Sequence, residues 1–241
     1  MAGQDGDDVI APTRLGHEGP RVHIRHGLTL AVRALRGHAS RPKGVRPVDR
    51  GDYTAAVLTS QDLITWTPRR IAVAGTSGSG KTTLADELAR RLDCPRVELD
   101  SLYHGEGWVP RETFTDDVDA FTAGDRWVIE HQYREVRPLI TARADTVLWL
   151  DWPNWFTLQR LVRRTVRRRL TGEELWNGNR EGPLTGIFTD QDHIIRWGFR
   201  VRNRLRPVIP ALEEQFPHLH VVRFRRPREV EAWLERLARL R

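Results

Sequence analysis

The sequence predicts an α/β fold in which helices cover both faces of a five-stranded parallel sheet, giving three layers. Two observations predict it. From Arg69 onward, short apolar runs alternate with segments of helical periodicity, as in strands joined by crossover helices. A glycine-rich turn links the first apolar run to the first helical segment. With 241 residues, the chain is long enough for one such domain and an extension.

The expected strands and helices follow one another in a regular order. Strands are expected at five apolar runs, which are residues 71–74, 97–99, 127–129, 146–150 and 220–224. Helices are expected where apolar residues recur every three or four positions: after Thr83, from Pro110, from about Pro153 to Leu170, after an Asp190 cap, and from Pro227.

The first part of the chain has a different composition. Residues 1–51 contain eight glycines and four prolines, about double the usual share. This composition predicts a largely disordered N-terminal extension over residues 1–68, followed by one domain over residues 69–241. The extension carries a net positive charge, so it is either a basic arm or a tail without a function of its own.

Composition also limits the cellular location and the binding partners that we expect. The net charge is +7, and 37 of the 39 basic residues are arginine, which suits nucleic acid, an anionic surface or phosphorylated substrates. No apolar run approaches the roughly 18 residues of a membrane span, and the acidic start of the chain is not a secretory signal. A single cysteine, Cys94, forms no internal disulfide. We therefore expect a cytoplasmic protein with no membrane partner.

The strongest local signal is a phosphate-binding loop that contains one of only two lysines. It has the pattern G-x-x-x-x-G-K-[ST] between an apolar run and a helix, which is the context that this chemistry requires. The pattern predicts bound ATP and Mg²⁺, with Lys81 on the β- and γ-phosphates and Thr82 on the metal ion. The expected nucleotide-binding residues are Gly75, Thr76, Ser77, Gly78, Ser79, Gly80, Lys81, Thr82 and Thr83.

Acidic residues end three of the expected strands. These are Asp100, Glu130 and Asp151, and in parallel sheets ligands bind beyond the carboxyl ends of the strands. A carboxylate there can hold Mg²⁺, orient an acceptor hydroxyl or take its proton. Asp100 and Glu130 are candidate catalytic residues, and Glu130 and Asp151 are candidate metal ligands beside Thr82. Each acid is otherwise an ordinary turn or cap residue.

The helix expected after residue 153 is rich in arginine and contains no acid. Arg160, Arg164 and Arg168 share one face, where like charges repel unless an anion neutralises them. We expect Arg160 and Arg164 to contact phosphate, and Arg167 to Arg169 to form a solvated face. The glycine-rich residues 171–189 that follow predict a hinged lid, from which Arg180 reaches the transferred phosphoryl group.

From Arg70 to the C-terminus the chain resembles the topology modulation proteins, a family of adenylate-kinase-related P-loop NTPases. The pieces that carry the resemblance are Gly75–Thr83, Leu99-Asp100 with Trp108, Trp127-Val128-Ile129, Leu150–Pro153 with Arg160 and Arg164, and Gly178-Asn179-Arg180-Glu181. The resemblance implies a nucleoside monophosphate kinase-like fold in which Arg160 and Arg164 approach ATP. It also implies that residues 171–189 are the lid and residues 101–125 the acceptor-side segment.

The chain departs from the family after its third expected strand. The family usually has Asp-Gly-Asn-Tyr there, whereas this chain has Glu130-His131-Gln132-Tyr133. Glu130 keeps the charge on a side chain one methylene longer, His131 replaces a glycine, and Tyr133 is retained. The acceptor side lacks the pattern expected for AMP recognition, so the resemblance does not imply adenylate kinase activity.

Two functions from different classes follow from these observations. The leading hypothesis is a kinase that transfers the γ-phosphoryl group of ATP to a small-molecule or nucleotide acceptor, with plain ATP hydrolysis as a variant. The alternative is an ATP-binding regulator that acts on nucleic acid, and it is less favoured because no motif that reads DNA or RNA occurs. A GTPase is disfavoured because the sequence has no Asn-Lys-x-Asp motif for base recognition.

Overall fold

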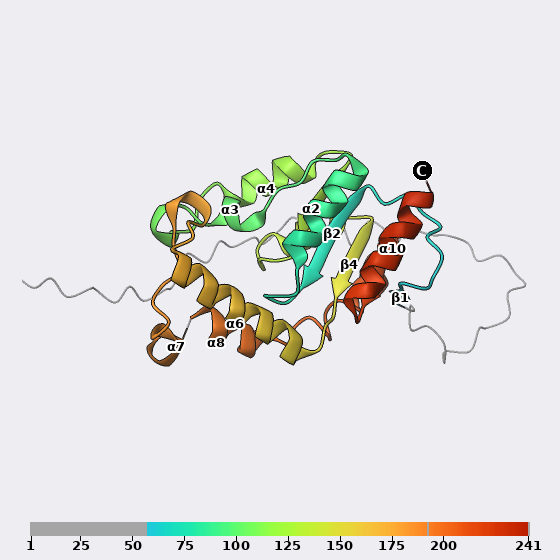
Figure 1. Cartoon of the computed structure of the whole chain (residues 1–241). Helices are drawn as coiled ribbons and strands as arrows, with labels where there is room; N and C mark the ends of the chain where they lie inside the picture. The colour runs from blue at the N-terminus through green and yellow to red at the C-terminus, as the bar shows by residue number, and fades with distance from the viewer. Residues whose placement is uncertain (1–56, 192, 241) are drawn as a thin grey trace, which may run out of the picture. The chain divides into compact units, whose positions relative to one another are not determined.

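The computed structural model describes residues 57–191 and 193–240 of the chain (Figure 1). In these ranges lies a five-stranded, all-parallel sheet with the strand order β1-β5-β4-β2-β3. The strands are β1 (Leu58–Thr59), β2 (Arg70–Gly75), β3 (Trp127–Glu130), β4 (Thr146–Leu150) and β5 (His220–Phe224). The predicted three-layer α/β/α fold with a five-stranded parallel sheet is confirmed.

Helices and short helical turns connect the strands. They are α2 (Lys81–Leu92), α3 (Leu99–Tyr103), η1 (Glu106–Trp108), α4 (Phe114–Thr122), α5 (Arg137–Arg143), α6 (Asn154–Thr171), η2 (Trp176–Gly178), α7 (Gly186–Thr189), α8 (Ile194–Val201), α9 (Leu212–Gln215) and α10 (Pro227–Arg239). Most of the extension expected over residues 1–68 lies outside the described residues.

The strand expected at residues 97–99 is wrong. Only Arg96 pairs with β3, through a single parallel bridge to Val128. Pro95 has no N–H to donate, and Leu99 already begins α3, so the backbone cannot continue a ladder. The fifth strand is instead β1, where Leu58 pairs with Val222 before the position at which the sequence places the domain boundary.

Two expected helix starts also differ from the structure. Asp190 ends α7 rather than capping the next helix, which begins at Ile194 after His193. The ring of His193 accepts a hydrogen bond of 3.4 Å from the backbone N–H of Ile195, so a histidine takes the place expected for the aspartate. The helix expected from Pro110 begins at Phe114, after a turn closed by the Phe114 N–H and the Arg111 carbonyl.

Alternation along the strands sorts the core into two layers. In β2, Ile71 and Val73 face the layer that contains α2 and α10, and Ala72 and Ala74 face the opposite layer. The opposite layer is formed mainly by α3, α4, α5 and α9. Both faces of the sheet are therefore covered, as expected for parallel strands that are buried throughout.

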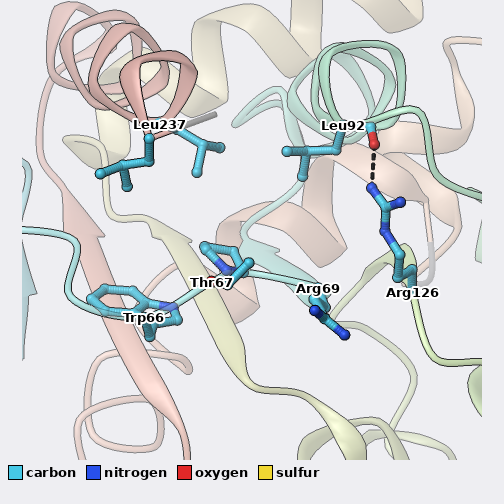
Figure 2. Close-up of a pocket in the computed structure, with 8 residues that line it drawn as sticks. Trp66, Thr67, Arg69, Leu92, Arg126 and Leu237 are labelled. Carbon is cyan, nitrogen blue, oxygen red and sulfur yellow. Dashed lines mark hydrogen bonds between the residues drawn. The ribbon is translucent and has the colours of Figure 1, made fainter.

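The described surface is hollowed at the amino ends of β2 and β3. Figure 2 shows this cavity of about 300 Å³, lined by Trp66 and Arg69 together with the ends of α2 and α10. Arg126 donates a hydrogen bond to the carbonyl of Leu92 at its edge. The glycine loop lies at the opposite, carboxyl end of β2, which is the end where ligands bind in such sheets. None of the helices in the described ranges has the length and apolar character needed to cross a membrane.

A histidine is buried directly after β3. His131 is 1% exposed, and its Nε2 lies 2.8 Å from the hydroxyl of Thr141. That hydroxyl donates its single hydrogen to the carbonyl of Arg137, so His131 Nε2 carries the proton and donates. Burial, followed by the charge of Arg137, lowers the pKa of His131 to about 3. His131 is therefore a neutral packing residue.

We predict that His131 makes the stability of the protein depend on pH. Its pKa is lower in the folded protein than the ordinary 6.5, so between these values the unfolded chain binds more protons. The free energy of unfolding is therefore unaffected by protonation of His131 above about pH 6.5. It falls as the pH is lowered from there toward 3, by at most about 1.4 kcal/mol per pH unit. Denaturant titrations of wild type and His131→Gln between pH 7 and pH 4 should diverge, with the variant less sensitive to pH. Parallel curves would contradict the assignment.

Candidate functional site

The turn between β2 and α2 has the geometry of an anion-binding loop. Gly78 and Gly80 have φ values of +83° and +93°, which side chains with a Cβ rarely adopt. Helix α2 starts at Lys81 with no acid in its first turn and no side chain capping its free N–H groups. The hydroxyl of Ser79 is buried without a hydrogen-bond partner in the described residues. The loop therefore offers unused donors at the positive end of a helix dipole.

Helix α6 holds the loop from the side. A Cβ at Gly78 would overlap the backbone carbonyl of Thr157 in α6, so only glycine permits this approach. The indole of Trp152, just before α6, donates a hydrogen bond of 2.7 Å to the carbonyl of Ser79. The Leu150–Pro153 segment thus stabilises the phosphate loop through the indole of Trp152.

Three predicted site residues meet where the loop ends. The hydroxyl of Thr82 donates to Oε1 of Glu130 over 2.7 Å, and the Lys81 ammonium lies 3.9 Å from Oε2 of the same carboxylate. Glu130 is 2% exposed and Lys81 is 9% exposed. Strand β3 pairs with β2 so that Glu130 lies opposite Val73, which aims the carboxylate at the start of α2.

The residues of this end of the sheet fit ATP and Mg²⁺. Free N–H groups, an unpaired hydroxyl and a buried ammonium suit a polyphosphate. The Thr82 hydroxyl and the Glu130 carboxylate supply the oxygen ligands that Mg²⁺ prefers. No cluster of three His, Cys, Asp or Glu side chains occurs in the described residues, so the metal ion would depend on phosphate and water for its other ligands.

Asp100 lies in a polar cluster formed with the residues that follow β3. Its Oδ1 accepts hydrogen bonds from the Tyr133 hydroxyl at 2.6 Å and from the Gln132 amide at 2.8 Å. Burial, and then the charge of Asp100, raises the pKa of Tyr133, so the phenol remains a donor. Glu98 adds a second carboxylate, whose pKa is raised by burial although Trp176 hydrogen-bonds to it. Asp100 stands in the first turn of α3 rather than at a strand end.

The predicted arginine row of α6 divides into three environments. Arg160 lies over the ring of Phe156, and its Nη2 is 3.5 Å from where a Cβ of Gly80 would stand. Arg164 is half-buried, and its Nε has no hydrogen-bond partner among the described residues. Burial, followed by the charge of Arg168, lowers the pKa of Arg164, and Glu181 opposes this shift more than Asp100 and Glu130 do. Arg168 bonds Glu173 at 3.2 Å and faces Trp176, so the solvated face expected over Arg167–Arg169 is wrong at this position.

Asp151 and Arg180 are not brought to Glu130 by contacts among the described residues. Asp151 binds two guanidinium groups, at 2.9 Å from Nε of Arg223 and 3.1 Å from Nε of Arg206. Arg180 is exposed, and its Nη1 lies 3.8 Å from the Cβ position of Gly172 at the end of α6. The metal role of Asp151 and the phosphoryl contact of Arg180 stay predictions.

The sequence did not predict several residues of this region as site residues. They are Glu98, His104, Gln132, Tyr133, Trp176, Asn177 and Asn179. None belongs to a catalytic motif, and most reach the site from loops that are distant in sequence. Two of them have a local signal: Tyr133 stands where the resembled family has its tyrosine, and Asn179 lies in the Gly178–Glu181 segment that carries the resemblance.

The parallel sheet, the phosphate loop after β2 and the helix that begins in it define a three-layer P-loop fold. No protein-family model matches the chain. Solved structures to which it is similar include a gluconokinase from Sinorhizobium meliloti 1021 (18% identity, 72% of this chain and 94% of that one, TM-score 0.43). Others are shikimate kinases from Bacteroides thetaiotaomicron (19%, 71% and 97%, 0.40) and Acinetobacter baumannii (18%, 72% and 93%, 0.43).

We predict that Gly78→Ala damages both the loop and the fold. The alanine would be strained at φ +83° and would push α6 away from the loop, which should lower the free energy of unfolding by more than about 1 kcal/mol. Binding of a fluorescent ATP analogue should fall with it. Gly182→Ala is the matched control, because nothing lies within 4 Å of its Cβ position. Equal unfolding curves for the two variants would refute the packing argument.

Proposed function

We propose that this protein is an ATP-dependent phosphotransferase that passes the γ-phosphoryl group of ATP to a small-molecule or nucleotide acceptor. One observation carries the proposal. Lys81 and Thr82 of the phosphate loop meet the buried carboxylate of Glu130, over 3.9 Å and 2.7 Å. A cation for phosphate oxygens and two oxygen ligands for Mg²⁺ therefore stand together at the start of α2.

Each residue has a defined task in this proposal. Lys81 neutralises charge on the β- and γ-phosphates, and Thr82 and Glu130 hold Mg²⁺. Bound Mg²⁺ would supply positive charge that offsets the negative charge of the phosphates. Arg160 and Arg164 stabilise negative charge that develops on the transferred group. Asp100, steadied by Tyr133 and Gln132, orients the acceptor and takes the proton when the acceptor is a hydroxyl.

Other predictions remain beside this proposal. Water as the acceptor would make the protein an ATPase, and the same residues would serve that reaction. No observation on the described residues favours the nucleic-acid regulator, since arginines such as Arg168 and Arg223 bind acidic side chains of the chain itself. Membership of the topology modulation family and a cytoplasmic location also stay predictions.

We predict that Lys81→Ala lowers ADP release from ATP by at least about 100-fold, because the developing charge on the phosphates loses its buried partner. The measurement is coupled ADP detection while nucleosides, nucleotides and small hydroxylated metabolites are offered as acceptors. Mass spectrometry of the most active mixture then separates transfer to an acceptor from transfer to water.

Arg90→Ala is the matched control for the loss of a cation from α2. Arg90 is exposed near the far end of the helix and pairs with Glu87 at 2.7 Å, so turnover should be unchanged. Circular dichroism should show that both variants fold. Wild-type turnover in folded Lys81→Ala would reject the proposal.

A further inference from the structure

Two loops that are distant in sequence meet beside the acceptor-side cluster. The acceptor loop, residues 104–110, is closed by a bridge between His104 and Pro110. The lid loop, residues 174–180, is closed in the same way by a bridge between Glu174 and Arg180. Each contains a short helical turn, η1 or η2, and these turns contact one another.

Two asparagines of the lid loop join it to the acceptor loop and the end of α3. The Asn179 amide donates to the carbonyl of Gly105 at 2.8 Å, and its oxygen accepts from the backbone N–H of Trp108 at 2.9 Å. Asn177 donates to the carbonyls of Ser101, at 3.3 Å, and His104. Asn177 is exposed, whereas Asn179 is 5% exposed, so the bonds of Asn179 are the better shielded from water and the more costly to lose.

The joined loops continue to the acceptor carboxylate through side-chain contacts. Trp176 of the lid loop stacks on His104, with ring centroids 6.1 Å apart and an angle of 25°. His104 lies 3.3 Å from the Tyr133 hydroxyl, which donates to Asp100. Arg180 follows Asn179 directly in the chain, so the bonds of Asn179 also fix the backbone position of Arg180.

We propose that Asn177 and Asn179 form a latch that docks the lid loop on the acceptor loop, with Asn179 as a positioning residue for phosphoryl transfer. Docking places Trp176 against His104 and thereby orders Tyr133 and Asp100. The latch couples the lid to the acceptor side rather than to the phosphate loop. ATP binding therefore does not need it, whereas transfer to an acceptor does. The kinetic part rests on the proposed phosphotransfer, and the docking itself does not.

Hydrogen–deuterium exchange of the full chain tests the docking without an acceptor. In Asn179→Ala, residues 104–109 and 174–180 should both exchange at least about tenfold faster, while α2 stays unchanged. Asn179→Asp has the same shape and keeps the accepting oxygen but cannot donate to Gly105, so it should also release both loops. Asn203→Ala, which removes an exposed asparagine hydrogen-bonded to Asn154, is the control. If Asn179→Ala does not fold, the exposed Asn177→Ala serves in its place.

Kinetics with the acceptor found by ADP release test the positioning role. In the Asn179 variants, kcat should fall by about tenfold or more, while KM for ATP changes less than about twofold. Faster exchange in the lid loop alone, or wild-type exchange in Asn179→Asp, would overturn the latch. Unchanged kcat with both loops released would overturn the positioning role. If both loops exchange faster in the variants but the wild-type protein phosphorylates no acceptor, the docking is retained and the phosphotransfer is rejected.

Discussion

The candidate site depends on one buried carboxylate. Glu130 at the end of β3 is almost fully removed from water, and an ionised group in that position is costly unless it is paired and hydrogen-bonded. Thr82 and Lys81 supply both kinds of partner. Since these two residues form the first turn of α2, the carboxylate ties the start of the helix to the sheet. The hydrogen bond and the ion pair of Glu130 thus hold the phosphate loop against β3.

The geometry of α6 extends this arrangement toward the lid. Its contact with Gly78 sets the helix against the loop, and a residue four positions further lies about 6 Å along the same face. Arg160 consequently lies beside the loop, Arg164 is half-buried, and Arg168 lies over the ring of Trp176. One row of like charges is tolerated because each member meets a different environment.

Local chemistry accounts for what the sequence predicts well. The phosphate loop and the acid at residue 130 are each specified within a few residues, and the alternation of strands and helices gives the fold class. The strand at residues 97–99 fails because apolar character does not reveal that Pro95 and the start of α3 leave room for a single bridge. Asp151 pairs with Arg206 and Arg223 from distant segments, and its position after β4 does not reveal these partners. The latch needs contacts between residues more than 70 positions apart, which no local pattern records.

Strained backbone conformations gather around the two loops that the proposed latch joins. In the described residues, four non-glycine residues have positive φ, and three of them are Trp108, Tyr133 and Asn177. Such conformations cost on the order of 1–3 kcal/mol each and persist only where the surroundings enforce them. Here the enforcing contacts are the latch bonds, the aromatic stack on His104 and the bond from Tyr133 to Asp100. The latch bond to Trp108 and the stack on His104 join the two loops, and His104 in turn lies beside the Tyr133 hydroxyl. The proposed latch therefore couples ordering of the lid loop to ordering of Tyr133 and Asp100.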